Sequence, residues 1–517
     1  MPAPSQPPRL PRPRTRLPLH TRLRNLAIPL GLGAIAALGL DPFGIWGATL
    51  VAMGALLWRL SRSPDAGSAF RQALAAGLGW FALSLNWIVE PFLVQPEIYG
   101  WMAPFALILM ALGGGLFWAI PVWLARWIGG GWRMRVIGIA AALVLSDWLR
   151  GWIFTGLPWA LTGHVWIGTP ADQLAAALGA PGLSALTLIA AALPALCWRP
   201  TEARAAGFAP GAILSALLVG AVWAGGMARL AQPLPEDRPI TLRLVQPNAE
   251  QALKWDPEWA RIFYQRLIDL SATPGPRDLV IWPETAVNFL LEDAVPVLPD
   301  LARAADAPLI LGIQRRADSR YFNSLVTLDR AGGVTGIYDK FHLVPFGEYI
   351  PWGDAMARIG ISAFAAQQGN GYSPGPGATV MGAGEAPPFQ PLICYEAIFP
   401  RHLRGLPRRP GWLLQITNDS WFGRFSGPYQ HLAQARLRAV QSGLPLIRVA
   451  NTGVSAVIDA RGGLRQTLGL GEMGVIDAAL PGALPETPWM RWGDGPVILL
   501  MALLFAASVW RGRVRLA

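Results

Sequence analysis

Lysine is almost absent from this chain. Of the 43 lysine and arginine residues among 517, only Lys254 and Lys340 are lysines. Arginine is a bulky fork that effectively never loses its proton, whereas lysine carries a compact ammonium whose pKa moves on burial. A lysine retained where arginine serves elsewhere is therefore a candidate for a site that needs a compact amine. Chance is the alternative, because an arginine-rich composition still leaves a few lysines.

Charge of either sign is also scarce. Charged residues make up 15% of the chain and hydrophobic residues 53%, whereas a soluble globular domain has roughly 25% charged residues. The long uncharged runs lie within residues 1–230 and 494–511, while 238–490 has the composition of a soluble α/β domain. The sequence thus predicts a membrane protein with two modules, the second long enough to bury its own core.

About eight transmembrane helices are expected. Each candidate approaches the ~20 apolar residues needed to cross a bilayer, and the first stays in place because no small-residue cleavage site follows it. We expect a disordered basic tail at 1–24, a seven-helix domain at 25–230, the α/β domain at 238–490, a last helix at 494–511 and a short tail at 512–517. The candidate spans are 25–40, 44–60, 68–90, 101–125, 134–154, 174–197, 208–229 and 494–511.

The distribution of arginine predicts the orientation. Arginines gather before residue 25, in alternate connections near 59–71, 126–135 and 199–204, and after residue 510, whereas the intervening turns are poor in them. By the positive-inside rule both termini are cytoplasmic and 238–490 lies on the other side. Attraction to anionic lipid then accounts for the net charge of +11, and nucleic acid is not an expected partner.

Cysteine and histidine are scarce too. Cys197 and Cys394 are the only cysteines, and on this topology they lie on opposite sides, so no disulfide joins them. Cys394 is then a lone thiol in an oxidising compartment: either a reactive group or a buried small hydrophobe. The five histidines form no metal-ligand spacing, so we expect no metal and no other cofactor.

The second module has the pattern of an α/β domain. Polar residues directly follow several apolar, β-branched runs, notably Glu284, Cys394 and Asn418. Because a rigid strand aims the side chain that follows it, such ends collect catalytic groups. Expected strands are 240–245, 278–282, 308–313, 323–328, 334–338, 391–394, 412–417, 446–449 and 454–458, with amphipathic helices at 256–271 and 428–442.

A cysteine, a glutamate and a lysine together indicate acyl transfer. A thiol is largely protonated at neutral pH, so Cys394 needs a base such as Glu284. When the thiolate attacks a carbonyl, the oxygen becomes negative, and a buried ammonium from Lys340 with the backbone N–H of Tyr395 fits the task of stabilising it.

Three ordered motifs carry a family resemblance. They are Trp-Pro-Glu-Thr-Ala at 282–286, Tyr-Asp-Lys-Phe-His-Leu-Val-Pro-Phe-Gly-Glu-Tyr-Ile-Pro at 338–351 and Leu-Ile-Cys-Tyr-Glu at 392–396. They resemble the Glu, Lys and Cys motifs of the nitrilase superfamily. With the membrane architecture, residues 25–511 closely resemble the bacterial apolipoprotein N-acyltransferase family.

The resemblance implies a fold and residue roles. The 238–490 module is expected to be a nitrilase-like αββα sandwich on the periplasmic side of the bacterial inner membrane. Glu284 is implied as general base and acid, Lys340 as oxyanion stabiliser and Cys394 as nucleophile. Glu348 is implied as a supporting glutamate and Tyr395 as a backbone donor. Trp255 and Glu396 are implied as substrate-binding residues.

The implied reaction has two lipid partners within the bilayer. Cys394 takes the sn-1 acyl chain from a phospholipid, with phosphatidylethanolamine expected, and forms a thioester. The α-amino group of the S-diacylglyceryl cysteine of an apolipoprotein then accepts the acyl chain, giving triacylated lipoprotein by ping-pong kinetics. A monomer is the family expectation.

Alternatives to these roles remain open. Glu348 could orient Lys340, Glu396 could tie a helix N-terminus together, and His342 is a weak rival as the base. Segment 350–374 is either an apolar lid or a plain surface loop. The rival functions are a membrane-tethered amidase or nitrilase, and a catalytically dead lipid-binding or transport protein. We also expect Lys254→Arg to be tolerated.

Overall fold

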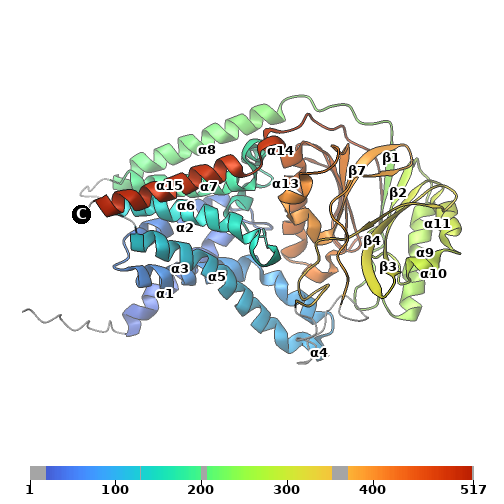
Figure 1. The fold of residues 1–517 in the computed structure, drawn as a ribbon, viewed down its shortest axis with the longest axis horizontal. Coiled ribbons are helices and arrows are strands. Elements are labelled where there is room, and N and C mark those ends of the chain that lie inside the picture. The colour runs from blue at the N-terminus through green and yellow to red at the C-terminus, as the bar shows by residue number, and fades with distance from the viewer. Residues whose placement is uncertain (1–18, 129, 199–205, 352–370, 515–517) are drawn as a thin grey trace, which may run out of the picture.

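The computed structural model describes residues 19–128, 130–198, 206–351 and 371–514. Figure 1 shows two parts side by side, a bundle of helices and an α/β sandwich. The C-terminal helix returns to the bundle after the sandwich is complete. The bundle is therefore built from both ends of the described chain.

Eight long helices form the bundle within the described residues. They are α1 (Leu19–Ala37), α2 (Trp46–Ser61), α3 (Ala66–Ser84), α5 (Ala103–Ile128), α6 (Trp132–Arg150), α7 (Ala175–Leu196), α8 (Ala209–Leu230) and α15 (Gly495–Val514). Each overlaps one expected span. Length and hydropathy alone mark three of the described segments as able to cross a membrane, Pro96–Trp127, Pro170–Leu196 and Ala206–Leu230, and a bent pair of α3 with Asn86–Leu93 would be a fourth.

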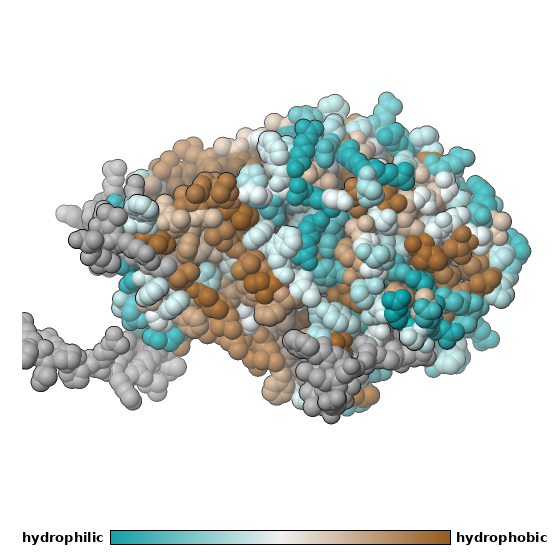
Figure 2. Space-filling model, viewed as in Figure 1, coloured by the Kyte–Doolittle hydropathy of each residue, from teal (hydrophilic) through white to brown (hydrophobic). Residues whose placement is uncertain are grey.

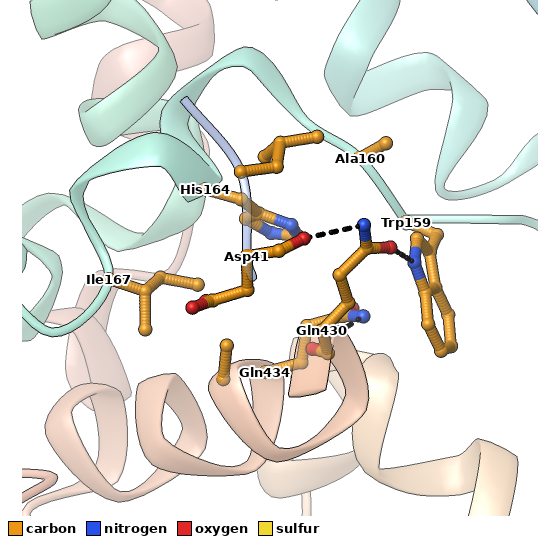
Figure 3. A pocket seen from close by; sticks show the side chains of 9 residues that line it. Asp41, Trp159, Ala160, His164, Ile167, Gln430 and Gln434 are labelled. Atoms are coloured by element: carbon orange, nitrogen blue, oxygen red, sulfur yellow. Dashed lines mark hydrogen bonds between the residues drawn. The ribbon is translucent and has the colours of Figure 1, made fainter. Parts of the chain in front are cut away.

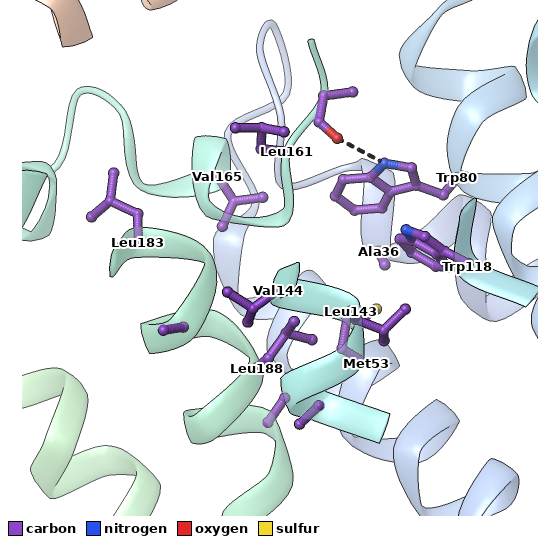
Figure 4. Close-up of a cluster of buried hydrophobic side chains, with 14 of the residues drawn as sticks. Ala36, Met53, Trp80, Trp118, Leu143, Val144, Leu161, Val165, Leu183 and Leu188 are labelled. Atoms are coloured by element: carbon purple, nitrogen blue, oxygen red, sulfur yellow. Dashed lines mark hydrogen bonds between the residues drawn. The ribbon is translucent and has the colours of Figure 1, made fainter. Parts of the chain in front are cut away.

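Small residues allow the bundle helices to approach closely. A Cβ added at Gly77 in α3 would lie 2.5 Å from Gly115 of α5, so these two helices meet backbone to backbone. Large side chains fill the space elsewhere, as Trp80 and Trp118 do in Figure 4. The Trp80 indole donates to the carbonyl of Ala160, 3.2 Å away, which satisfies its N–H in this apolar setting.

The outside of the bundle is apolar as well. Figure 2 shows hydrophobic residues covering the bundle, whereas the sandwich surface is largely hydrophilic. Leu109, Ile213, Leu217 and Leu503 are each about 60% exposed or more. A soluble surface does not display so much contiguous apolar area, and these apolar helices fit association with a membrane.

The sandwich contains two six-stranded sheets. Their strand orders are β12-β1-β2-β3-β4-β5 and β11-β10-β9-β8-β7-β6. The first sheet comprises β1 (Thr241–Gln246), β2 (Leu279–Ile281), β3 (Leu309–Ala317), β4 (Arg320–Leu328), β5 (Val334–Asp339) and β12 (Gly474–Ala479). The second comprises β6 (Met381–Ala383), β7 (Ala386–Ile393), β8 (Trp412–Thr417), β9 (Leu446–Ala450), β10 (Ser455–Ile458) and β11 (Leu464–Leu468).

Helices cover both sheets and complete an αββα sandwich. Helices α9 (Pro257–Ala272) and α11 (Leu298–Ala305) lie on the outer side of the first sheet, and α13 (Gly427–Ser442) lies between the second sheet and the bundle (Figure 1). Every expected strand overlaps an observed one. Three strands, β6, β11 and β12, had no counterpart in the prediction. The other α-helices within the described residues are α4 (Pro96–Tyr99), α10 (Leu291–Ala294) and α14 (Pro488–Trp492).

The hydrophobic core of the bundle extends across its boundary with the sandwich. Ile398, Phe399 and Val440 of the sandwich belong to the same buried cluster as the bundle side chains. Polar contacts cross the boundary too: the Trp159 indole donates to Gln430 Oε1 at 2.6 Å, and Gln430 Nε2 donates to the Asp41 carbonyl at 2.9 Å (Figure 3). This boundary holds a cavity of about 10 Å³, room for roughly one water molecule.

Candidate active site

Three strand ends bring the predicted catalytic residues together. Glu284 follows β2 and Lys340 follows β5 in the first sheet, while Cys394 follows β7 in the second. The two sheets pack face to face, so residues from distant parts of the sequence meet at their edge. All three side chains are more than 90% buried.

Lys340 lies between two carboxylates. Its Nζ is 2.7 Å from Glu348 Oε1 and 3.6 Å from Glu284 Oε1. Burial opposes the charged form, but the carboxylates of Glu348 and Glu284 outweigh it and raise the pKa of Lys340 above its ordinary value. Lys340 therefore stays an ammonium at neutral pH, and Glu348 holds it in place.

Two asparagines hold the carboxylates in position: Asn418, which the sequence places at a strand end, and Asn323, which was not among the predicted site residues. Asn323 Nδ2 donates to Glu284 Oε1 at 2.7 Å and to Glu348 Oε1 at 3.1 Å. The backbone N–H of Asn418 donates to Glu284 Oε2 at 2.9 Å. For Asn323 the available signal was an amide side chain within an otherwise apolar strand. The contact of Asn418 is made by its backbone N–H, which no residue type in the sequence reveals.

Glu284 is suited to accept a proton. Burial raises the pKa of Glu284, and Lys340 opposes that rise. A carboxylate with a raised pKa is a stronger base than an exposed one and can return the proton later.

Cys394 sits at a sharp turn after β7. Its φ is +50°, the left-handed region that a residue with a Cβ rarely adopts. Burial raises the pKa of the Cys394 thiol, the charge of Glu284 raises it further, and Lys340 lowers it. The thiol is therefore protonated at rest and needs a base to become a nucleophile. Cys197 is also free, so neither cysteine is in a disulfide.

Glu396 joins two of the site loops. Its carboxylate accepts hydrogen bonds from the backbone N–H groups of Phe341, His342 and Ile393 and from the Tyr338 hydroxyl, at 2.8–3.2 Å. It is fully buried. Four protein donors leave little capacity for a ligand, so this geometry favours the structural alternative over substrate binding.

His342 packs against Phe399 and His402. Its ring stacks on Phe399 with centroids 3.9 Å apart, and its Nδ1 lies 3.1 Å from His402 Nε2. Burial lowers the pKa of His342 to about 4, with Arg401 adding to the effect.

The other predicted residues lie around this centre. Tyr395 follows Cys394 and donates its hydroxyl to the Gly156 carbonyl of the bundle at 3.0 Å. Trp255 is half-buried on the loop before α9. Beside it, Lys254 is only 4% exposed; burial lowers the pKa of Lys254 to about 8, and Glu284 partly opposes this shift.

Most of the expected lid lies outside the described residues, which omit 352–370. Its two ends are described, and backbone hydrogen bonds hold them together next to Glu348. Tyr349 pairs with Gly371 as an isolated bridge, and the N–H of Tyr372 donates to the Glu348 carbonyl at 2.8 Å.

No group of three or more His, Cys, Asp or Glu side chains within the described ranges is arranged to hold a metal ion.

Comparison with known proteins agrees with both parts of the fold. Residues 32–193 match the family model of the apolipoprotein N-acyltransferase N-terminal domain, and residues 241–487 match that of carbon-nitrogen hydrolases. The apolipoprotein N-acyltransferase of Caulobacter vibrioides is 38% identical, with 95% of this chain and 94% of that protein aligned. That of Rhizobium meliloti is 38% identical over 88% of this chain and 89% of its own.

Among solved structures, a CN-hydrolase superfamily protein of Xanthomonas campestris matches 51% of this chain and 97% of its own. The pair has 20% sequence identity and a TM-score of 0.35.

Proposed function

Because this chain belongs to the apolipoprotein N-acyltransferase family, we propose that it moves an acyl chain from a phospholipid to a lipoprotein through a thioester on Cys394. The donor is the sn-1 ester of a phospholipid such as phosphatidylethanolamine. The acceptor is the α-amino group of an S-diacylglyceryl cysteine. The proposal rests on one observation: the buried side chains of Glu284, Lys340 and Cys394 lie together beside an apolar bundle.

The first half-reaction forms the thioester. Glu284 takes the thiol proton as Cys394 Sγ attacks the ester carbonyl carbon. The carbonyl oxygen gains negative charge, which the Lys340 ammonium and the Tyr395 N–H stabilise, each donor contributing on the order of 3 kcal/mol. The carbon–oxygen bond then breaks, and Glu284 returns the proton to the departing lysophospholipid oxygen.

The second half-reaction forms the amide. The neutral acceptor amine attacks the thioester carbonyl, and Glu284 takes a proton from its nitrogen. The same two donors stabilise the second oxyanion. Cys394 leaves as a thiolate and recovers its proton from Glu284, so the enzyme returns to its starting state.

Glu348 has a supporting role in this scheme. Lys340 Nζ donates one hydrogen bond to Glu348 Oε1 at 2.7 Å, which orients the ammonium. Its other two N–H groups remain for Glu284 and the oxyanion. Trp255, half-buried beside this site, is proposed to contact substrate.

The arrangement of the bundle supports the proposed topology of about eight spans with both termini in the cytoplasm. Arg62 lies over the rings of Trp58, Trp132 and Trp198, so the arginine-rich connections meet at one end. Residues of the arginine-poor connections, Asp41 and Trp159, contact the sandwich. The sandwich then lies on the periplasmic side of the inner membrane.

Labelling tests the first half-reaction. The purified protein is incubated in detergent with a phospholipid that carries a fluorescent sn-1 acyl chain. We expect hydroxylamine-sensitive label on wild type and none on Cys394→Ala. Equal label on both variants, or none on wild type, would overturn the proposal, and the latter would favour the lipid-binding alternative.

A hydrolase remains the main chemical rival, because the same residues serve amidases. The bundle that covers the sandwich favours a lipid substrate, since a small polar amide would not require it. Transfer to water in place of a lipopeptide amine would favour the rival.

A further inference from the structure

A buried polar network lies directly behind Cys394 and contacts its backbone. The side chains of Gln415, Asp419, His431 and Arg448 are each fully buried. None of them is placed among the groups that act on the substrate. They come from β8, the turn that follows it, α13 and β9, and two of them, Gln415 and His431, lie 3.1 Å from the Cys394 carbonyl oxygen.

The orientation of Gln415 is determined by its neighbours. Arg448 donates to Gln415 Oε1 at 2.6 Å, which identifies the other amide atom as the nitrogen. That nitrogen lies 3.1 Å from the Cys394 carbonyl oxygen and 2.9 Å from His431 Nε2. Its two hydrogens therefore go to Cys394 and His431.

The histidine completes this arrangement as a neutral ring. His431 Nδ1 lies 3.0 Å from Asp419 Oδ1, and Asp419 also pairs with Arg448. Burial, then the charge of Arg448, lowers the pKa of His431, so the proton on Nδ1 is donated to Asp419 while Nε2 accepts from Gln415. Every polar group in the chain of contacts has a partner.

Peptide planarity transmits this arrangement to the oxyanion donor. The Cys394 carbonyl and the Tyr395 N–H belong to one planar trans peptide, and they point in opposite directions. Holding the carbonyl oxygen on Gln415 therefore sets the direction of the Tyr395 N–H.

We propose that Gln415, oriented by Arg448, Asp419 and His431, is a positioning residue that sets the Cys394–Tyr395 peptide plane and aims the Tyr395 N–H at the oxyanion. This inference rests on the proposed function. Gln415 does not touch substrate and acts through the backbone alone.

Two rates measured on Gln415→Met separate positioning from general structural damage. Acylation by the fluorescent phospholipid forms an oxyanion, whereas alkylation of Cys394 by iodoacetamide does not. We expect acylation to fall about 100- to 1,000-fold, as for the loss of one oxyanion donor, while alkylation changes less than about threefold.

Gln390→Met is the matched control. Gln390 is a fully buried glutamine on the neighbouring strand β7, and it donates to the His402 carbonyl at 2.7 Å. The Gln390→Met variant loses a buried hydrogen bond of the same kind. We expect its acylation and alkylation rates to stay near those of wild type. If Gln415→Met does not fold, Gln415→Glu keeps the shape and the contact with Arg448 but replaces the donor with an acceptor.

Two results would overturn the positioning role. One is acylation within threefold of wild type in the Gln415 variant that folds; the other is a parallel fall of acylation and alkylation. Wild-type protein that forms no acyl-enzyme would instead refute the proposed function, and the positioning role with it.

Discussion

At the residue scale, Lys340 is the side chain for which arginine is the poorest substitute. Its Nζ fits between two carboxylates, and the side chain is 1% exposed. A guanidinium plane would have to displace Glu284 or Glu348. We predict that Lys340→Arg keeps the fold but lowers acyl-enzyme formation about 100-fold or more.

The rate of hydroxylamine-sensitive labelling measures this effect. Arg303→Lys exchanges the same two residue types at an exposed position and should leave the rate unchanged. A Lys340→Arg rate within tenfold of wild type would show that charge alone is needed there.

Lys254 differs from Lys340 because the described residues give its ammonium no hydrogen bond or ion pair. Its folded pKa of about 8 is below the value near 10.4 of an unfolded lysine. Between these values the unfolded chain binds more protons, so this group makes stability rise with pH. At pH 7 Lys254 is charged in its buried position, which lowers the free energy of unfolding.

Lys254→Met should therefore raise the unfolding temperature by a few degrees at pH 7, with a smaller gain at pH 9. Scanning fluorimetry at both pH values checks this. A gain that is equal at the two values would contradict the account. Burial also argues against the expectation that Lys254→Arg is tolerated, since the larger cation cannot lose its charge.

At the element scale, Glu396 connects the loop after β5 to the turn after β7. Glu396→Gln would set an amide N–H₂ against donors that now meet a carboxylate. We predict a stability loss of about 2–4 kcal/mol and slower acylation, with the KM for phospholipid changed less than about threefold. A large rise in KM without loss of stability would restore the substrate-binding role.

Strand positions and the three motif residues could be predicted because apolar runs and strand ends are local features. The edge strands were harder. In β11 most side chains are exposed, so alternation does not mark it, and β6 has three residues. The contact of Asn323 with Glu284 joins residues 39 apart in the sequence, and that of His431 with Cys394 joins residues 37 apart. No local pattern encodes such contacts.

Helix ends in the bundle show a similar limit. The expected span 68–90 is a helix to Ser84 and then bends by 49° into Asn86–Leu93. Hydropathy continues through the bend, so composition alone could not place it.

At the scale of the whole molecule, the proposed topology can be tested with single cysteines. Arg320→Cys lies on the exposed start of β4, and Arg71→Cys lies near the arginine-rich end of the bundle. In spheroplasts we predict that an impermeant maleimide labels the first, and labels the second only after lysis. Labelling of Arg71→Cys in intact spheroplasts would reverse the orientation.

A chase of the isolated acyl-enzyme tests whether the Cys394 thioester donates its acyl chain to a lipoprotein. Protein labelled on Cys394 by the fluorescent-acyl phospholipid is freed of donor and mixed with a diacylated lipopeptide. We predict that label leaves Cys394 and appears in equal amount as a hydroxylamine-resistant amide on the lipopeptide. Release of the label as free fatty acid, at a rate independent of the lipopeptide, would contradict it.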